Sequence, residues 1–217
     1  MVRRIIAENP TWGAPRIHGE GRMLGFDVSE RTVSRLMPRR PPDPEARQRW
    51  RNFLRNHREV LAAMDFFTVP TATFRVLYVF FVIQNSRRTV LHVRVSEHPT
   101  AGWIIQQLRE AFPFDSAPRH LIFDNDKTYG ADVLAVIEHM GIRCKLITPY
   151  CPWQNGVAER WVETVRRGLL DHVIVLNERH LHRLLSDFVA YYHEDRTHLG
   201  LGKGTPSMRT ATSKTNR

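Results

Sequence analysis

The sequence predicts an α/β protein whose core is a mixed five-stranded sheet flanked by helices. Three apolar segments with strand character follow one another between residues 60 and 97, and the connections between them are short. Short connections predict antiparallel neighbours. After residue 100 the pattern alternates between helix and strand, which is typical of a mixed sheet with helices packed on its faces.

The segments of this expected core are bounded by turn residues and by changes in apolar periodicity. The expected strands are 60–69, 75–84, 89–97, 120–124 and 142–147. The expected helices are 100–112, 131–140, 157–170 and 176–194. Together they predict a core domain over residues 60–206, followed by a polar tail over 207–217.

Residues 1–37 are expected to form two or three short helices ahead of this core. Ser29 is a good helix N-cap, and the helix that it begins carries polar side chains available to face DNA: Arg31, Thr32, Ser34 and Arg35. The alternative is a small helical appendage that packs on the core. Gly21 lies within one of these predicted helices and weakens it by about 1 kcal/mol.

Residues 38–59 differ in composition from both neighbours. Four prolines between residues 38 and 44 predict a linker, because proline interrupts helices. A segment follows in which arginines surround Trp50, Phe53 and Leu54. It is expected either to lie along a phosphate backbone or to be a solvated helix beside the core.

Composition favours a polyanionic partner. The 217 residues contain 32 Lys and Arg against 22 Asp and Glu, a net charge of +10. Nucleic acid is the simplest partner for such a balance. Cys144 and Cys151 are too few for a disulfide framework or a four-cysteine zinc site. The longest apolar run, 76–83, is too short to span a bilayer, so no membrane partner is expected.

Three carboxylates point to a chemistry. Asp65 interrupts an apolar strand, Asp124 follows another, and Glu159 lies near the start of a helix. Carboxylates in apolar strands are costly to bury without compensation. If the three converge, they form a site of oxygen ligands that suits divalent cations such as Mg²⁺.

The motifs around these residues resemble the integrase catalytic core of insertion-sequence transposases and retroviral integrases, the Asp-Asp-Glu polynucleotidyl transferases. The matching motifs are M-D-F-F-T around Asp65, F-D-N-D-K-T-Y-G around Asp124 and T-P-Y-C-P-W-Q-N-G-V-A-E-R-W around Glu159. Two further matches are R-G-L-L-D-H-V-I at 167–174 and Y-Y-H-E-D-R-T-H-L-G-L at 191–201. The resemblance covers about residues 60–206. It implies a ribonuclease H-like fold, and residues 1–37 resemble the helix-turn-helix segment that precedes such cores.

The resemblance also implies the reaction and its ligands. Asp65, Asp124 and Glu159 would be catalytic residues that hold two Mg²⁺ or Mn²⁺ ions about 4 Å apart, with Asp65 between both. Gln154, Asn155 and Arg166 would contact DNA. The alternative for Gln154 and Asn155 is a purely structural loop. His193, Arg196 and His198 could serve either the fold or DNA.

Two neighbouring carboxylates compete for these assignments. Asp126 is the alternative to Asp124, and a turn residue capping its own loop is the simpler interpretation of it. Glu163 lies one turn beyond Glu159, but the W-Q-N-G-V-A-E register favours Glu159. The stretch from Asp124 to Glu159 is one residue shorter than is common in the family, and the expected place of the difference is Tyr150-Cys151-Pro152. This leaves activity, rather than fold, in question.

The sequence therefore predicts a DNA transposase or integrase that cuts element ends and joins the 3′-hydroxyl to target DNA. The alternative is a sequence-specific DNA-binding protein with a catalytically degenerate core. Double-stranded DNA and further copies of the chain are the expected partners. No signal peptide is recognised, and the expected location is cytoplasmic, associated with the nucleoid when bound to DNA. Because relatives usually carry a longer DNA-binding region ahead of the core, a shortened one is expected here.

Overall fold

The computed structural model describes residues 1–9, 12–37, 44–124, 128–148 and 151–208. The chain forms two compact units, Met1–Arg49 and Trp50–Arg217. Within the described ranges, no helix is both long enough and apolar enough to cross a membrane.

The first unit contains three short helices with a small core of their own. They are α1 (Val2–Glu8), α2 (Ala14–Met23) and α3 (Glu30–Leu36). Ile5, Ile6, Ala14, Ile17 and Val33 form its buried cluster. As expected, Ser29 caps α3, and its hydroxyl oxygen accepts a hydrogen bond from the main-chain N–H of Thr32 at 3.2 Å.

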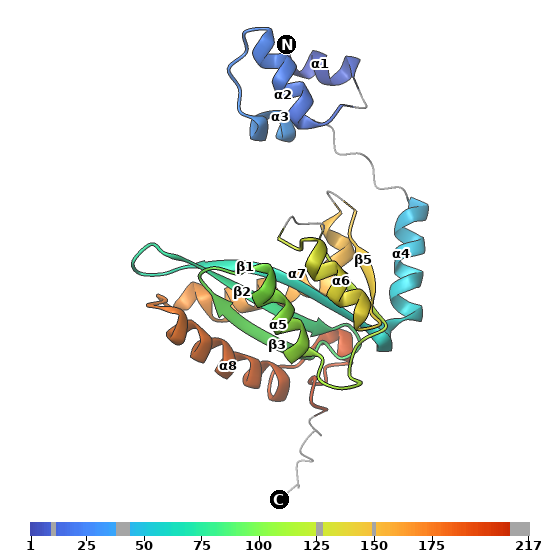
Figure 1. Ribbon diagram of the computed structural model, residues 1–217, viewed down its shortest axis with the longest axis vertical. Coiled ribbons are helices and arrows are strands. Elements are labelled where there is room, and N and C mark those ends of the chain that lie inside the picture. The colour runs from blue at the N-terminus through green and yellow to red at the C-terminus, as the bar shows by residue number, and fades with distance from the viewer. Residues whose placement is uncertain (10–11, 38–43, 125–127, 149–150, 209–217) are drawn as a thin grey trace, which may run out of the picture. The chain divides into compact units, whose positions relative to one another are not determined.

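The second unit is built on the predicted mixed sheet, which is confirmed. Its strands are β1 (Leu61–Pro70), β2 (Val76–Gln84), β3 (Val90–Ser96), β4 (His120–Phe123) and β5 (Arg143–Leu146). They lie in the order β3-β2-β1-β4-β5 (Figure 1). The first three strands are antiparallel neighbours, whereas β1, β4 and β5 run parallel. The observed ends lie within one residue of the predicted ones.

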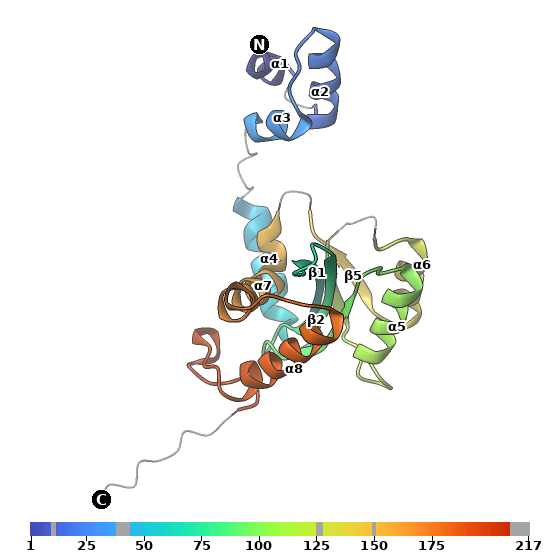
Figure 2. The same ribbon diagram turned by 90° about the vertical axis from the view of Figure 1, so that its left-hand side faces the viewer.

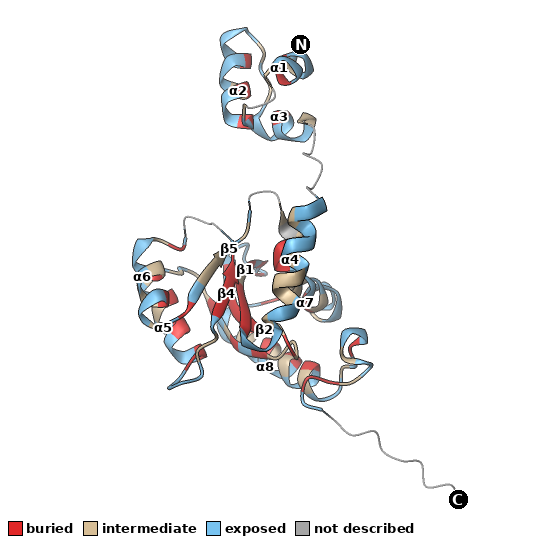
Figure 3. Cartoon of the chain, turned by 90° about the vertical axis from the view of Figure 1, so that its right-hand side faces the viewer, coloured by how far each residue is buried: buried red, intermediate tan, exposed pale blue. Residues whose placement is uncertain are grey.

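Helices cover both faces of the sheet (Figure 2). One face carries α5 (Ala101–Ala111) and α6 (Ala131–His139). The other carries α7 (Gly156–Gly168) and α8 (Glu178–Glu194). Strands β1, β2 and β4 are largely buried (Figure 3), because each of them places alternate side chains into two separate hydrophobic clusters.

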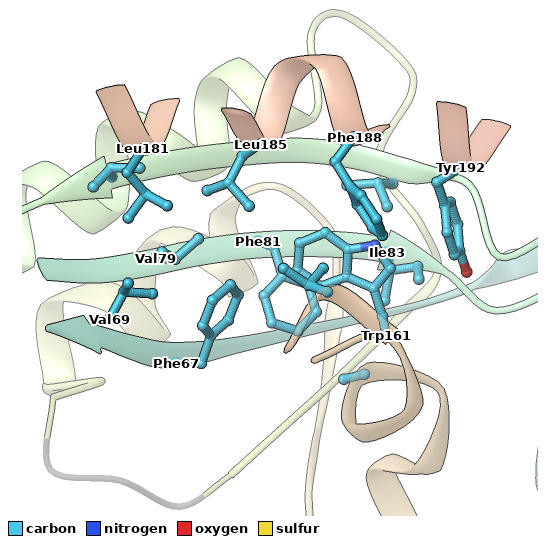
Figure 4. Close-up of a cluster of buried hydrophobic side chains, with 14 of the residues drawn as sticks. Phe67, Val69, Val79, Phe81, Ile83, Trp161, Leu181, Leu185, Phe188 and Tyr192 are labelled. Carbon is cyan, nitrogen blue, oxygen red and sulfur yellow. The ribbon is translucent and has the colours of Figure 1, made fainter. Parts of the chain in front are cut away.

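The hydrophobic cluster beneath α7 and α8 holds α7 in place against the sheet. Leu181, Leu185, Phe188 and Tyr192 point from α8 toward the strands, and Trp161 of α7 lies among them (Figure 4). The rings of Trp161 and Phe81 are 4.3 Å apart between centroids. Trp161 is almost completely buried, so α7 is anchored to the sheet by one large side chain.

Helix α4 (Pro44–Asn56) is the main departure from the expected domain boundaries. Its apolar residues Trp50, Phe53 and Leu54 pack against the cluster beneath α7 and α8. The compact core unit accordingly begins at Trp50 rather than at residue 60. The predicted linker prolines at 38, 41 and 42 lie outside the described residues.

Candidate active site

Asp65 lies on the central strand of the sheet, facing the α7 side. Its neighbours two residues away in each direction, Ala63 and Phe67, belong to the cluster beneath α7 and α8. Alternation along a strand therefore directs Asp65 to the same face. The side chain is half-buried, and its Oδ1 accepts a hydrogen bond from the main-chain N–H of Phe66 at 2.8 Å.

Asp124 follows the last residue of β4, beside β1. The parallel register pairs Ala63 with Ile122. Continuing this register by two residues brings Asp124 next to Asp65. Ile122 belongs to the α7-side cluster, so the same alternation directs Asp124 toward α7. Asp124 is exposed. Its competitor Asp126 lies outside the described residues.

Glu159 lies in the first turn of α7 and is exposed to solvent. The helix turns its buried side, which includes Ala158 and Trp161, toward the sheet. A carboxylate near a helix N-terminus is favoured by the helix dipole. The start of α7 is held against β1, because the side-chain nitrogen of Asn155 donates to the main-chain oxygen of Met64 at 3.4 Å.

The three carboxylates line one open hollow of about 1150 Å³. It extends from the ends of β1 and β4 along the exposed side of α7, and Glu97, His98 and Thr100 beyond β3 also line it. The sequence analysis did not identify Glu97, His98 and Thr100 as residues of the site, because their side-chain types alone do not indicate one. The available signal was their position shortly after the end of β3.

The donor set of the hollow suits hard divalent cations, which prefer oxygen ligands. Within the described ranges, however, no three His, Cys, Asp or Glu side chains lie close enough to hold one ion. A site in which each ion takes only two carboxylates is compatible with this arrangement, since Mg²⁺ commonly keeps waters and takes substrate phosphate oxygens as further ligands. The residues present therefore fit divalent metal whose coordination is completed by the substrate.

Arg166 brings positive charge to the same hollow. Its Nη2 donates to the main-chain oxygen of Thr68 at 3.3 Å, and its guanidinium carbon lies 5.8 Å from the ring centroid of Phe67. Glu163, the alternative to Glu159, also lines the hollow but pairs with Arg167 at 2.6 Å. This pairing gives Glu163 a structural partner of its own.

Gln154 and Asn155, expected to contact DNA, are buried. The side-chain oxygen of Gln154 accepts a hydrogen bond from the main-chain N–H of Thr148 at 2.6 Å, and Asn155 bonds to Met64. Both side chains are thus turned into the protein. The structure favours the alternative interpretation, a structural loop that sets the start of α7.

Helix α4 supplies a contact that the sequence analysis missed. The indole nitrogen of Trp50 donates to the main-chain oxygen of Gln154 at 3.1 Å. The spacing of Trp50, Phe53 and Leu54 is the signal that could have revealed a docked helix.

The other expected DNA contacts lie in the first compact unit. Arg31, Thr32, Ser34 and Arg35 are all exposed on α3, while Val33 is buried in the core of that unit. The side chains are therefore presented to solvent as a set.

Comparison with known proteins agrees with this geometry. Residues 140–206 match the family model described as an integrase core domain. The fold matches a chain of the simian T-cell lymphotropic virus intasome, solved in complex with PP2A regulatory subunit B56 gamma. That match has a TM-score of 0.58 and 13% identity, over 100% of this chain and 80% of the other. The resemblance to integrase catalytic cores is confirmed.

Two further similarities fit this result. The HTLV-2 integrase catalytic core domain, solved in complex with magnesium, matches with a TM-score of 0.53 and 12% identity over 69% of this chain and 94% of that domain. The uncharacterized protein K02A2.6 of Caenorhabditis elegans is 29% identical over 89 residues, which are 41% of this chain and 7% of that protein. The structural matches show the ribonuclease H-like integrase core fold, and the family match supports an integrase- or transposase-like function.

Proposed function

We propose that this protein is a DNA transposase or integrase that cleaves DNA at element ends and joins the 3′-hydroxyl to target DNA. The observation that carries the proposal is the convergence of Asp65, Asp124 and Glu159 on one hollow. Two of these residues come from adjacent parallel strands and the third from a helix pinned against one of those strands.

Each carboxylate has a role in this proposal. Asp65 would hold both of two divalent ions, with Asp124 on one and Glu159 on the other. When bound, Mg²⁺ or Mn²⁺ would activate the attacking oxygen and stabilise the leaving oxygen of the phosphodiester. The chain itself must fix the three carboxylates relative to one another, which the register of β1 with β4 and the hydrogen bond from Asn155 would accomplish.

The substrate would be held by cationic side chains around the hollow. Arg166 lines the same hollow as Glu159, from two turns further along α7, and would hold a phosphate of the substrate. Arginine binds phosphate through two parallel hydrogen bonds, which fixes orientation as well as position. The exposed residues of α3 would read the element ends, as in helix-turn-helix proteins.

Assembly and location follow from the same proposal. Two DNA ends must be processed together, so the protein would work as a homo-oligomer. The similar HTLV-2 integrase catalytic core domain is described as a dimeric form, which supports this expectation. The protein would act in the cytoplasm, associated with the nucleoid when bound to DNA.

A joining assay tests the proposal. The full chain is mixed with duplex oligonucleotides that carry the genomic sequence flanking its gene, together with a supercoiled target and Mg²⁺ or Mn²⁺. Joined products that require the divalent ion and the flanking sequence are expected. Specific binding of the ends without any cleavage or joining in either metal would contradict it.

The second candidate is a DNA-binding protein with a catalytically degenerate core. The observation that favours it is that no three metal-ligating side chains in the described ranges lie close enough to hold one ion. The shorter stretch before Glu159 points the same way. The joining assay separates the two candidates, because only the first forms covalent products.

A further inference from the structure

Helix α4 has two faces of opposite character. Its apolar face packs on the core beneath α7, through Trp50, Phe53 and Leu54. Arg51 lies between these residues in the sequence and Arg55 directly follows them, and both arginines are exposed. Docking of the apolar face therefore fixes which side of the helix solvent reaches.

The charges on α4 are unbalanced. The helix sequence P-E-A-R-Q-R-W-R-N-F-L-R-N contains four arginines and one carboxylate, Glu45, which pairs with Arg49 at 3.2 Å. Arg51 and Arg55 are one turn apart, and like charges at this spacing repel each other. A helix whose outer face only contacts solvent commonly carries positive and negative charges in alternation along that face. The repulsion is tolerated here because the apolar face anchors the helix.

The two guanidinium groups retain donors for an external ligand. Arg55 donates from Nη2 to the side-chain oxygen of Asn52 at 3.1 Å, which uses one of its five N–H groups. No ion pair joins Arg51 or Arg55 to a carboxylate in the part of the chain that the structure describes.

We propose that Arg51 and Arg55 form a phosphate-binding track for duplex DNA, on the helix that also holds the loop before Glu159. The inference rests on the proposed function in taking DNA as the partner. Four residues of α-helix rise about 6 Å, which is roughly two nucleotide steps of one DNA strand. The two arginines thus match phosphates two steps apart on one strand, and each can form paired hydrogen bonds to a phosphate.

The track lies on the helix that reaches the candidate active site. The same helix donates from Trp50 to the main-chain oxygen of Gln154, in the short 3-10 helix η2 (Pro152–Asn155) that leads into α7. A duplex held by Arg51 and Arg55 would therefore lie against the helix that supports the loop before Glu159. The track would add general DNA affinity and no sequence preference, since backbone contacts carry no base information.

The test compares two double variants of the full chain. Arg51→Gln with Arg55→Gln removes the track, and Arg179→Gln with Arg183→Gln is the control. The control residues are also exposed arginines one turn apart, on α8 of the same compact unit. Affinity for a random-sequence duplex is measured between 50 mM and 200 mM salt by fluorescence anisotropy, without divalent metal.

The track variant should bind on the order of tenfold more weakly at about 0.1 M salt, with the slope of log affinity against log salt reduced by roughly 1.8. In the control variant, the duplex affinity and the salt slope should both change much less. Equal losses in the two variants would overturn the proposal, because they would reflect net charge alone. Wild-type protein that binds no duplex would overturn this proposal and the proposed function together.

A second measurement uses only the wild-type chain, so its result does not depend on whether the variants fold. An arginine-specific dicarbonyl reagent is applied to the wild-type chain with and without duplex, and modified peptides are quantified by mass spectrometry. DNA should protect Arg51 and Arg55 severalfold more than Arg179 and Arg183. Equal protection would overturn the track while leaving DNA binding intact. Protection by poly-glutamate but not by duplex would instead assign the surface to an acidic protein.

Discussion

The indole N–H of Trp50 donates to the main-chain oxygen of Gln154, with 3.1 Å between nitrogen and oxygen. This bond joins helix α4 to the residue whose side chain holds the main-chain N–H of Thr148. The next residue, Asn155, holds the carbonyl of Met64 beside Asp65. Three hydrogen bonds from different elements thus converge on the two residues that precede α7.

Trp50→Phe should therefore slow DNA joining more than it weakens binding. The ring remains in its cluster while the donor is lost, at a net cost of about 1 kcal/mol in the free energy of unfolding. Displacement of Glu159 by about 1 Å would reduce turnover on the order of 100-fold. Turnover and duplex affinity are measured separately, with Phe53→Leu on the same helix as control. Equal turnover in the wild type and Trp50→Phe would remove Trp50 from the positioning of the site.

The anchoring of α7 predicts a graded loss of stability at Trp161. This side chain is almost completely buried against Phe81, so Trp161→Ala should lower the free energy of unfolding by about 3–5 kcal/mol. Trp161→Phe should cost under about 2 kcal/mol, because the indole nitrogen has no hydrogen-bond partner within the described residues. Denaturant unfolding measures both. A larger loss in the Phe variant than in the Ala variant would contradict this packing.

Stability should also fall in mild acid, through His120. Burial lowers the pKa of this residue, and nearby positive charges lower it further; they belong to His57, Lys145, Arg119 and Arg143. Because the folded-state pKa lies below the unfolded value of about 6.5, the unfolded chain takes up the proton first. The neutral imidazole is therefore compatible with the fold above about pH 6.5, and stability is lost as the pH falls below it.

His120→Phe should flatten that pH dependence. Neither ring nitrogen of His120 has a hydrogen-bond partner among the described residues, and the ring lies 5.3 Å from that of Phe53. A phenyl ring should fill the same space without taking up a proton. Thermal unfolding of both proteins between pH 7.5 and 5.5 makes the comparison. An unchanged pH dependence in the variant would assign the acid sensitivity to His92, His193 or His198, whose pKa values burial also lowers.

The exposed face of α3 predicts where sequence preference resides. The double variant Arg31→Gln with Arg35→Gln should lower the affinity for random-sequence duplex only modestly. It should, however, remove the preference for element ends, because base contacts rather than phosphate contacts specify sequence. Competition between end-sequence and random duplexes measures the ratio. A preserved ratio would favour a purely structural role for the first compact unit.

Much of the core was predictable because its signals are local. Apolar runs bounded by turn residues predicted the ends of β1 to β5 within one residue, and amphipathic periodicity predicted α5 to α8. The same patterns predicted that Asp65 lies within a strand and that Asp124 lies at the end of another. Their adjacency did not, because it depends on β4 pairing with β1 rather than with β3.

The roles of the polar residues were harder to predict from the sequence. Gln154 and Asn155 are equally suited to DNA and to main-chain partners, and only the packing of α4 and β1 around them determines that they are buried. Helix α4 was ambiguous for a similar reason. Its arginines suggested either a segment along a phosphate backbone or a solvated helix, whereas its docked face depends on contacts with residues far along the chain.

The central claim is that Asp65, Asp124 and Glu159 act together on DNA. The most direct test measures metal-dependent joining and DNA affinity in parallel for Asp65→Asn, Asp124→Asn and Glu159→Gln, with Asp126→Asn and Glu163→Gln as matched controls. The account predicts that the first three lose joining while their duplex affinity stays within about twofold, and that both controls remain active. Joining that survives in Asp65→Asn or Asp124→Asn, or that is lost in Asp126→Asn while Asp124→Asn remains active, would contradict it.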